Sequence, residues 1–524
     1  MSKKDLLVLS IAVVIVLVGA FLIRYSTELG PWTMVDTVDY FDVARNLSAG
    51  NGLVVTRASG LTRPMTIHPP FYSIVLAPAV ILQWDLLDFV RTLNIVLFGA
   101  LVLIVCLGTY QLTSSALLSI GFGLWMATNR AILRNFTAAL SEPLFLTVGF
   151  ASLYLLGEFI KTNKHWLMFT SALLAGLALL TRYSGIAFLA TGLFAILIWQ
   201  KTDWRAKIKD LASYTLVACS PMLLWLAYSW IYFPGNVPGR YEWVSNIWQA
   251  MSPFRLAFVA GLWEWLGLRL LFSTQEYRTQ MFILALVFLA LALGTIFALR
   301  VSTREKNAPL SEPALFGASL WAMFTIASTM MLLLSFIFVM DPKPWLDERL
   351  YSPIQIGTVF TTILFAYFCE TRLIRGAFRH IPSLAVIALL VVANTPATVT
   401  YAQQLHQRGA GYTSRAWKNS TVVPALQYIP PDKTIISNDP GAILFFAGRP
   451  AVDLMPIIKQ AGHNEIPEIL QKSGMALVLF EGKLVSQLRP IYEDGDEAEQ
   501  YIKKLTSNME AQFQGNNGTI YYTP

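Results

Sequence analysis

The sequence predicts a mainly α-helical, polytopic membrane protein with about eleven transmembrane helices and a small C-terminal α/β domain on the exterior side. The chain of 524 residues is 55% hydrophobic and only 14% charged, whereas soluble domains carry about a quarter of charged residues. Apolar runs of membrane-spanning length recur as far as residue 399. Beyond residue 400 the hydropathy falls, and short β runs alternate with helical segments.

A helix needs roughly 17–25 apolar residues to cross a bilayer. The first such run is long and lacks a small-residue cleavage site before the polar loop, so we interpret it as an uncleaved span. The expected spans lie at 6–23, 89–111, 114–133, 142–160, 165–181, 184–200, 211–233, 279–299, 314–339, 350–369 and 381–399. Together they form a membrane region over 1–400, with exterior loops at 24–88 and 234–278. Within the second loop, 252–272 has the pattern of a helix lying in the interface.

The distribution of lysine predicts the orientation in the membrane. With a cytoplasmic N-terminus, every lysine before residue 340 falls on the cytoplasmic side, as the positive-inside rule expects. These are Lys3, Lys4, Lys161, Lys164, Lys201, Lys207, Lys209 and Lys306. An odd number of spans then places the C-terminus outside. The net charge of +7 therefore reflects topology, and it does not indicate nucleic-acid binding.

Residues 401–524 are expected to form the exterior domain. The segments 433–454 and 475–482 contain short β runs bounded by turn residues, and 464–473 and 496–510 have helical patterns. None of the three cysteines lies in this domain, so no disulfide framework stabilises it. The lack of exterior cysteine is compatible with a bacterial envelope, and we expect the bacterial inner (plasma) membrane as the location. The five histidines show no zinc-site spacing.

Carboxylates stand at the exterior ends of three expected spans. The stretch "VDTVDYFDVARNLSAGNG" (35–52) follows the first span and predicts a short helix on which Asp36 and Tyr40 share a face. Glu142 begins a later span, with Ser141 as its expected cap. "PWLDERLYSP" (344–353) brings Asp347, Glu348 and Arg349 to the start of another. Ionisable groups at membrane depth indicate a functional site.

Each of these residues also has a structural interpretation. Asp36, Asp39 and Asp42 are alternatively solvated loop residues, and Glu142 alternatively interacts only with its helix dipole. Arg349 is alternatively an interfacial arginine whose stem is buried. His68 is alternatively a turn residue, and Arg182 with Tyr183 an interfacial anchor pair.

Four of these segments together resemble the GT-C glycosyltransferases, in particular the protein O-mannosyltransferase and lipid A aminoarabinose transferase families. The 35–52 stretch resembles their first exterior loop, "HPPFY" (68–72) their Pro-Pro-Leu-Tyr element, "SEPLF" (141–145) their second acidic motif and "ERLYSP" (348–353) their late arginine motif. The order and expected side of the motifs also match. One departure is Thr37, where many relatives have a second acidic residue, a role that Asp39 could take.

The resemblance implies an inverting glycosyltransferase that moves a hexosyl or pentosyl unit from a polyprenyl-phosphate donor to an acceptor at the exterior face. Asp36 would be the general base or orient the acceptor hydroxyl, with Glu142 as the second catalytic carboxylate. Arg349, and then Arg182, are the candidates for binding the lipid phosphate. The remaining candidates for substrate contacts are Asp39, Tyr40, His68, Tyr72, Tyr183, Glu348 and Tyr351.

Three questions stay open at this point. Relatives differ in metal dependence, so Asp36 and Glu142 either share a divalent metal ion or act without any cofactor. The acceptor is a lipid, a glycan or a protein. A polytopic transporter or lipid flippase is the alternative function, with the carboxylates as its ion or substrate site, and a non-catalytic scaffold is a further one.

Overall fold

A computed structural model of the chain describes residues 3–56, 62–234, 313–338, 348–373, 380–461, 468–471, 474–488 and 495–523. In these ranges seven helices are long and apolar enough to cross a membrane, and one further span is bent. The chain is thus a mainly α-helical, polytopic membrane protein with a small C-terminal sheet region, as predicted. It divides into two compact units, Met1–Glu28 with Thr66–Val75 and Leu87–Gln407, and Leu29–Met65 with Leu76–Leu86 and Arg408–Pro524.

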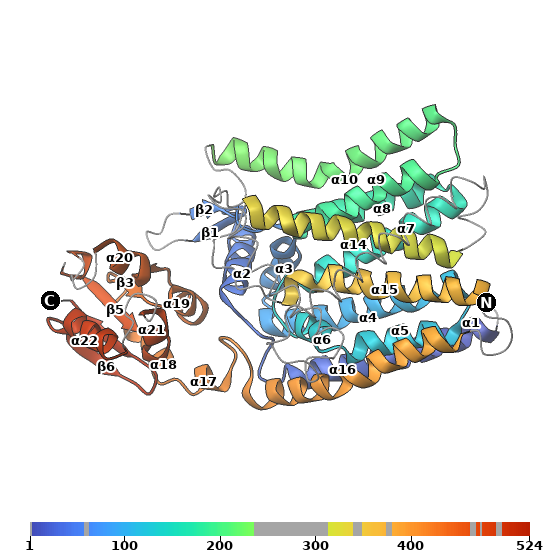
Figure 1. The fold of residues 1–524 in the computed structure, drawn as a ribbon. Coiled ribbons are helices and arrows are strands. Elements are labelled where there is room, and N and C mark those ends of the chain that lie inside the picture. The colour runs from blue at the N-terminus through green and yellow to red at the C-terminus, as the bar shows by residue number, and fades with distance from the viewer. Residues whose placement is uncertain are drawn as a thin grey trace. The chain divides into compact units, whose positions relative to one another are not determined.

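The first unit is a bundle of long helices (Figure 1). Its helices are α1 (Lys3–Ser26), α4 (Leu86–Thr113), α5 (Ala116–Thr128), α6 (Arg130–Phe136), α7 (Glu142–Thr162), α8 (His165–Thr181), α9 (Ile186–Trp199), α10 (Trp204–Tyr232), α14 (Pro313–Phe338), α15 (Glu348–Leu373) and α16 (Ile381–Arg408). Helices that follow one another in the chain pack side by side, as α7 does with α8 and α14 with α15. The apolar helix α3 (Phe71–Ile81) is divided between the two units.

Every expected span that falls within the described ranges is helical, and all but the one at 114–133 coincide with a single helix. The span expected at 279–299 and the interfacial helix expected at 252–272 lie outside the described residues. The span expected at 114–133 differs in shape, because α5 and α6 meet at an angle of 64°. The helices α8 and α9 have 17 and 14 residues, shorter than the other spans.

The bend between α5 and α6 is stabilised by side chains rather than left open. The side-chain oxygen of Asn129 accepts hydrogen bonds from the N–H groups of Ala131 and Ile132, and so caps α6. Thr398 of α16 donates to the backbone carbonyl of Thr128. Freed backbone groups at membrane depth need such partners, because no water competes for them there. The bend therefore depends on Thr398 of α16, which lies 270 residues further along the chain than Thr128.

The second unit combines the segment after α1 with the C-terminal residues. It contains α2 (Val35–Ser48), the hairpin of β1 (Val54–Thr56) and β2 (Thr62–Pro64), and a five-stranded sheet of order β4-β3-β5-β7-β6. The strands are β3 (Thr434–Ser437), β4 (Ala451–Asp453), β5 (Met475–Leu479), β6 (Glu510–Gln514) and β7 (Thr519–Tyr522). β3 is parallel to β4 and β5, whereas β7 is antiparallel to β5 and β6.

Short helices complete this second unit: α17 (Arg415–Lys418), α18 (Val422–Ala425), α19 (Pro440–Ala447), α20 (Leu454–Ala461), α21 (Glu481–Leu488) and α22 (Gly495–Thr506). The segment 440–447 was expected to continue a β run but forms α19 instead. The Asp439 side chain caps this helix by accepting from the Ala442 N–H, Pro440 follows, and Gly448 ends it with a φ of +63°. Local capping thus outweighs an apolar run that is also compatible with a strand.

Helix α2 shares a hydrophobic core with the C-terminal segment. Val38 packs in one cluster with Tyr412, Ile435 and Ala476, and α2 contacts α19. The region after the first expected span therefore belongs to the same compact unit as the sheet. That residues 1–400 and 401–524 fold as separate domains stays a prediction.

Candidate active site

The candidate site is built around the buried carboxylate of Glu142, the first residue of α7. Its Oε1 atom lies 2.9 Å from Nη1 of Arg182 and 3.5 Å from Nη1 of Arg349. The Glu142 side chain is 5% exposed, and the two arginine side chains are 23% and 12% exposed. One carboxylate is therefore shared by two guanidinium groups in a poorly hydrated place.

Arg182 comes to this position because of a tight turn after α8. It is extended, with φ and ψ of −148° and 137°, and the 3-10 turn Tyr183–Gly185 follows it. A Cβ on Gly185 would lie 2.4 Å from the backbone nitrogen of Leu179, so only glycine lets the turn close against α8. The Arg182 Nη1 also donates to Ser141 Oγ at 3.3 Å.

The start of α7 is held by side chains from two neighbouring helices. On α4, the Asn94 amide donates to the carbonyls of Phe136 and Ala138, which belong to the turn before Glu142. On α6, the Asn135 amide donates to Ser352 Oγ of α15 at 2.7 Å. These buried hydrogen bonds fix the turn before Glu142 and link α6 to the first turn of α15, which carries Arg349. The carboxylate and its second cation are therefore positioned together.

A cavity of about 190 Å³ opens beside this carboxylate. Its wall is formed by the segment after β2, by the starts of α7 and α15, by the turn after α8, and by α14. Its polar and charged lining side chains are His68, Glu142, Thr181, Arg182, Tyr183, Ser184, Ser328, Ser335 and Arg349. Tyr183 also donates to the carbonyl of Thr66 at 2.9 Å, which fixes the segment that carries His68. The cavity is large enough for a polar group of a small-molecule ligand.

Five predicted site residues thus line one cavity, although they come from four separate stretches of the chain. They are His68, Glu142, Arg182, Tyr183 and Arg349. Ser141 occupies the N-cap position of α7, but its hydroxyl makes no capping hydrogen bond and instead accepts from Arg182. The expectation that Ser141 caps the helix through its side chain is therefore wrong. Pro143, in the first turn, reduces the number of N–H groups that need a cap.

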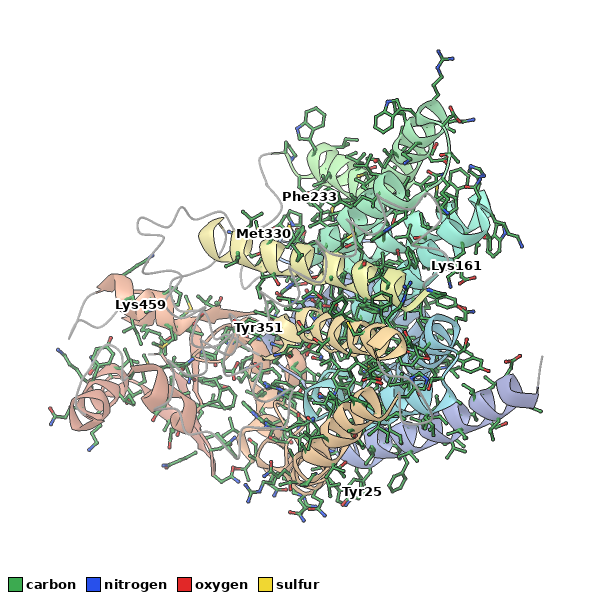
Figure 2. The ribbon with its side chains drawn as sticks, turned by 45° about the vertical axis from the view of Figure 1, so that its right-hand side comes forward. Tyr25, Lys161, Phe233, Met330, Tyr351 and Lys459 are labelled. Atoms are coloured by element: carbon green, nitrogen blue, oxygen red, sulfur yellow. The ribbon has the colours of Figure 1, made fainter. Side chains whose placement is uncertain are left out.

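Two predicted tyrosines lie in the packed interior and do not line the cavity. Tyr72 is fully buried near the start of α3, and Tyr351, labelled in Figure 2, is fully buried in the first turn of α15. The backbone of Glu348 begins α15, but its side chain and Asp347 lie outside the described part of the chain.

The remaining predicted residues belong to the second unit. Asp36 lies in the first turn of α2, and Asp39 and Tyr40 follow one turn later on the same face. Asp36 and Asp39 are half-buried, whereas Tyr40 is fully buried. The Met34 N–H donates to Thr37 Oγ1 at 3.1 Å, so the residue that departs from the glycosyltransferase pattern caps the helix.

Asp42 has a structural role that differs from its expected solvation. Its side chain is only 6% exposed. It accepts hydrogen bonds from the backbone N–H of Thr56 at 2.6 Å and from the side chains of Asn46 and Thr56. Asp42 therefore attaches β1 to α2 and holds the loop that ends this helix.

Two serines of the cavity wall are not among the predicted site residues. Ser328 and Ser335 lie two turns apart on α14 and therefore on one face. The seven-residue spacing of two serines in an apolar span was the only signal, and small hydroxyl side chains are common in transmembrane helices. Nothing in their sequence distinguished them from packing residues.

The part of the chain that the structure describes contains no cluster of metal-binding side chains. Over the described ranges, no three His, Cys, Asp or Glu side chains come close enough together to hold a metal ion. Glu142 supplies one carboxylate, which forms ion pairs with Arg182 and Arg349.

No protein-family model and no curated protein matches the sequence. Solved structures do match. The archaeal oligosaccharyltransferase AglB from Archaeoglobus fulgidus, in complex with an inhibitory peptide and a dolichol-phosphate, matches with a TM-score of 0.52 and 11% identity, over 96% of this chain and 73% of that chain. ArnT from Cupriavidus metallidurans bound to undecaprenyl phosphate matches with a TM-score of 0.47 and 11% identity, over 99% of this chain and 98% of that chain.

At 11% identity the match to AglB bears on architecture alone. It extends over nearly the whole chain, so it includes both the helix bundle and the C-terminal unit. The resemblance inferred from the four motifs is confirmed at the level of the fold. The chain has the fold of this archaeal oligosaccharyltransferase.

Proposed function

We propose that this protein is an inverting glycosyltransferase that moves a sugar from a polyprenyl-phosphate carrier to an acceptor at the exterior face of a bacterial plasma membrane. The observation that carries this proposal is the pair of arginines on Glu142 at the wall of a polar cavity. Guanidinium groups match phosphate oxygens in geometry and charge. The fold shared with AglB supports the same reading, since that structure contains a dolichol-phosphate.

The exterior placement of the site is supported by the charges at the ends of the helices. Glu142 begins α7, and Arg182 follows the end of α8. The connection between these two helices, at the other end of both, carries Lys161 and Lys164. Lysine-rich connections face the cytoplasm, so the cavity end of the bundle faces outward. A nucleotide sugar would be on the wrong side for this site, whereas a lipid carrier delivers its sugar there.

In the proposed reaction the acceptor hydroxyl oxygen attacks the anomeric carbon as the bond from that carbon to the carrier phosphate breaks. The proton of the hydroxyl passes to the carboxylate of Asp36, and the polyprenyl phosphate leaves with the bonding electron pair. A single displacement of this kind inverts the anomeric configuration. Arg182 and Arg349 stabilise the negative charge that develops on the phosphate.

Glu142 has a different part in this proposal. By sharing its Oε1 atom, it holds both guanidinium groups at one place before the donor arrives, so little reorganisation is needed during the reaction. Its buried Oε2 atom accepts no hydrogen bond from the residues that the structure describes. A buried acceptor without a donor is costly, so this oxygen is suited to receive a hydroxyl group of the bound sugar.

The decisive experiment measures sugar transfer by the purified full-length protein in proteoliposomes, using a panel of labelled polyprenyl-phosphate sugars. The variant Asp36→Asn keeps the size of the side chain but removes its basicity. We expect it to insert normally and to lose at least about a hundredfold in transfer, the low end for loss of a general base. Asp39→Asn tests whether Asp39 assists Asp36.

The matched control is not Asp42, because that residue holds β1. Glu28→Gln is suitable, because Glu28 is 60% exposed and has no role in the proposed chemistry. Normal transfer by a well-inserted Asp36→Asn protein would refute the role of Asp36. Movement of substrate across the vesicle membrane without any sugar transfer would instead identify a transporter.

A further inference from the structure

A second cavity lies in the helix bundle at the opposite end of α7 from Glu142. It has a volume of about 60 Å³, and α4, α7, α14 and α15 line it. The lining side chains are mainly apolar and include Leu153, Phe316, Leu320, Trp321 and Phe360. Lys161 and Glu142 are 19 residues apart on one helix, about 28 Å at 1.5 Å per residue. The second cavity is therefore distinct from the candidate active site.

Two glycines that line this cavity are not required for close contact between helices. A Cβ on Gly157 would meet only Phe316, at 3.7 Å, and a Cβ on Gly108 would meet Tyr154 at 3.5 Å. Both are ordinary van der Waals distances. Gly317 differs, because its Cβ would lie 2.5 Å from the side chain of Leu112. Gly108 and Gly157 thus leave room that a larger residue could fill.

Polar groups are confined to one end of the cavity. Lys161 Nζ lies 3.0 Å from Glu158 Oε1, and both side chains are about a quarter exposed. The Gln111 amide donates to the hydroxyl of Tyr154 at 2.9 Å. Gln111 and Lys161 stand near the ends of α4 and α7, so the polar end lies where these spans leave the membrane.

The dimensions match one leaflet of a bilayer. From Lys161 to Phe150 the cavity follows α7 over eleven residues, which is about 16 Å at 1.5 Å per residue. The hydrocarbon core is about 30 Å thick, so a single leaflet contributes about 15 Å. Polar side chains at the interface and apolar side chains over the depth of one leaflet match the amphipathic character of a membrane lipid.

We propose that this cavity binds one acyl chain of a zwitterionic phospholipid, with an ethanolamine-phosphate headgroup at Glu158 and Lys161. The charges favour this headgroup over an anionic one, because the phosphate pairs with Lys161 while the ammonium pairs with Glu158. A headgroup without an ammonium group would place its negatively charged phosphate beside the Glu158 carboxylate, and no positive charge of the lipid would offset their repulsion. The site lies in the opposite leaflet from the proposed donor site, and it holds a resident lipid rather than the substrate.

The test uses the full-length protein in nanodiscs of equal phosphatidylethanolamine and phosphatidylglycerol. Each lipid is added in turn as a probe with a photoreactive acyl chain, and the labelled peptides are identified by mass spectrometry. We expect the ethanolamine probe to label residues 150–157 and 316–321 about tenfold more strongly than the outer face of α1. We expect the glycerol probe to label them less.

Two variants make the test specific. Gly157→Leu fills the cavity and should lower the labelling by about tenfold, whereas Ala151→Leu, on the same helix but outside the cavity, should leave it unchanged. Lys161→Gln does not alter the packing and should reduce the preference for the ethanolamine probe, which keeps the test valid if Gly157→Leu fails to fold.

Several results would overturn the proposal. These are equal labelling of the cavity and of α1, insensitivity to Gly157→Leu in a folded protein, or a preference for the glycerol headgroup. Labelling of the cavity by a photoreactive polyprenyl phosphate would assign it to the donor instead. None of these results depends on whether the protein transfers sugar.

Discussion

Helix α7 carries a carboxylate beside positive charge at each end, and the two arrangements differ in kind. At its start, Glu142 is buried and shared by two arginines from other elements of the chain. Near its end, Glu158 pairs with Lys161 only three residues away, and both are partly exposed. Water screens the second pair, which contributes little to stability. The first is sheltered, so the loss of one partner leaves a poorly hydrated charge.

The sequence separation of the paired residues distinguishes a candidate functional site on a membrane helix from a local charge pair. A charge pair within one helix turn forms wherever the spacing allows it. The Glu142 carboxylate pairs with two cations from distant parts of the chain. Arg182 lies 40 residues and Arg349 lies 207 residues after Glu142, so this cluster forms only when the helices of the bundle have assembled. Such a costly arrangement is retained where it serves chemistry.

The largest expected effect comes from exchanging Glu142 for glutamine. Glu142→Gln leaves Arg182 and Arg349 without their shared carboxylate, so the two guanidinium groups repel each other and lose their fixed position. We expect sugar transfer to fall by about a hundredfold, as for loss of a preorganised electrostatic group. Initial rates in proteoliposomes measure this.

Glu158→Gln is the matched control at the other end of the helix. It should leave the transfer rate unchanged and the free energy of unfolding within about 1 kcal/mol of the wild type. Equal losses of transfer in both variants would remove the distinction between the two ends of α7.

The second prediction concerns the cation that Glu142 orients. Arg349→Ala removes a charge-assisted hydrogen bond to the carrier phosphate, so kcat/KM for the donor should fall by about tenfold to a hundredfold. Arg349→Lys keeps the charge but loses the planar fork, so its loss should be smaller. Donor titrations of both variants measure the difference. Unchanged donor kinetics in Arg349→Ala would exclude this residue from phosphate binding.

The third prediction compares two glycines, one near each end of the bundle. Gly185→Ala places a Cβ 2.4 Å from backbone atoms under Arg182, and should lower the free energy of unfolding by about 1–3 kcal/mol and weaken donor use. Gly108→Ala meets only ordinary contacts at 3.5 Å, and should raise stability by up to about 1 kcal/mol through helix propensity. Thermal unfolding in detergent checks both. If Gly185→Ala were neutral, the backbone would not fix Arg182.

The smallest expected effect concerns the pH dependence of stability in the second unit, where the buried group is a tyrosine. Tyr412 is buried and donates to Asp439 Oδ1 at 2.8 Å. Burial, and then the neighbouring Asp439 carboxylate, raise the pKa of Tyr412 above its usual value of 10.0. Above pH 10 the unfolded chain therefore releases this proton while the folded chain keeps it, so stability falls as the pH rises.

Tyr412→Phe removes this dependence. The stability advantage of the wild type over Tyr412→Phe should be constant below pH 10 and shrink above it, by up to about 1.4 kcal/mol per pH unit. Fluorescence of Trp417, whose ring lies 5.4 Å from that of Tyr412, reports unfolding of this region. A difference between the two proteins that stayed constant from pH 8 to 11 would contradict the prediction.

The helical part of the fold was predictable, because a membrane demands long apolar runs and these are visible in any sequence. The bend at Asn129 was not, since it depends on Thr398 of α16, which only the assembled bundle brings near. The helix α19 could have been found from Asp439, Pro440 and Gly448, whose capping signals were overlooked in favour of an apolar run.

The candidate site was predictable to a similar extent. Their positions at the ends of expected spans predicted Glu142, Arg182 and Arg349 as site residues. The structure brings these three side chains together. Sequence could not show that Glu142 receives both arginines on one oxygen, nor that Asp42 turns inward to hold Thr56. Both facts depend on contacts between elements distant in the chain.

The sharing of Glu142 by two arginines also has a consequence for biosynthesis. At about 5–20 residues per second, Arg182 leaves the ribosome roughly 2–8 s after Glu142, but Arg349 follows only after roughly 10–40 s. During that interval Arg182 is the only one of the two cations available to neutralise the carboxylate as α7 enters the bilayer. Loss of Arg182 should therefore lower the yield of inserted protein, whereas loss of Arg349 should spare insertion and affect only the finished site.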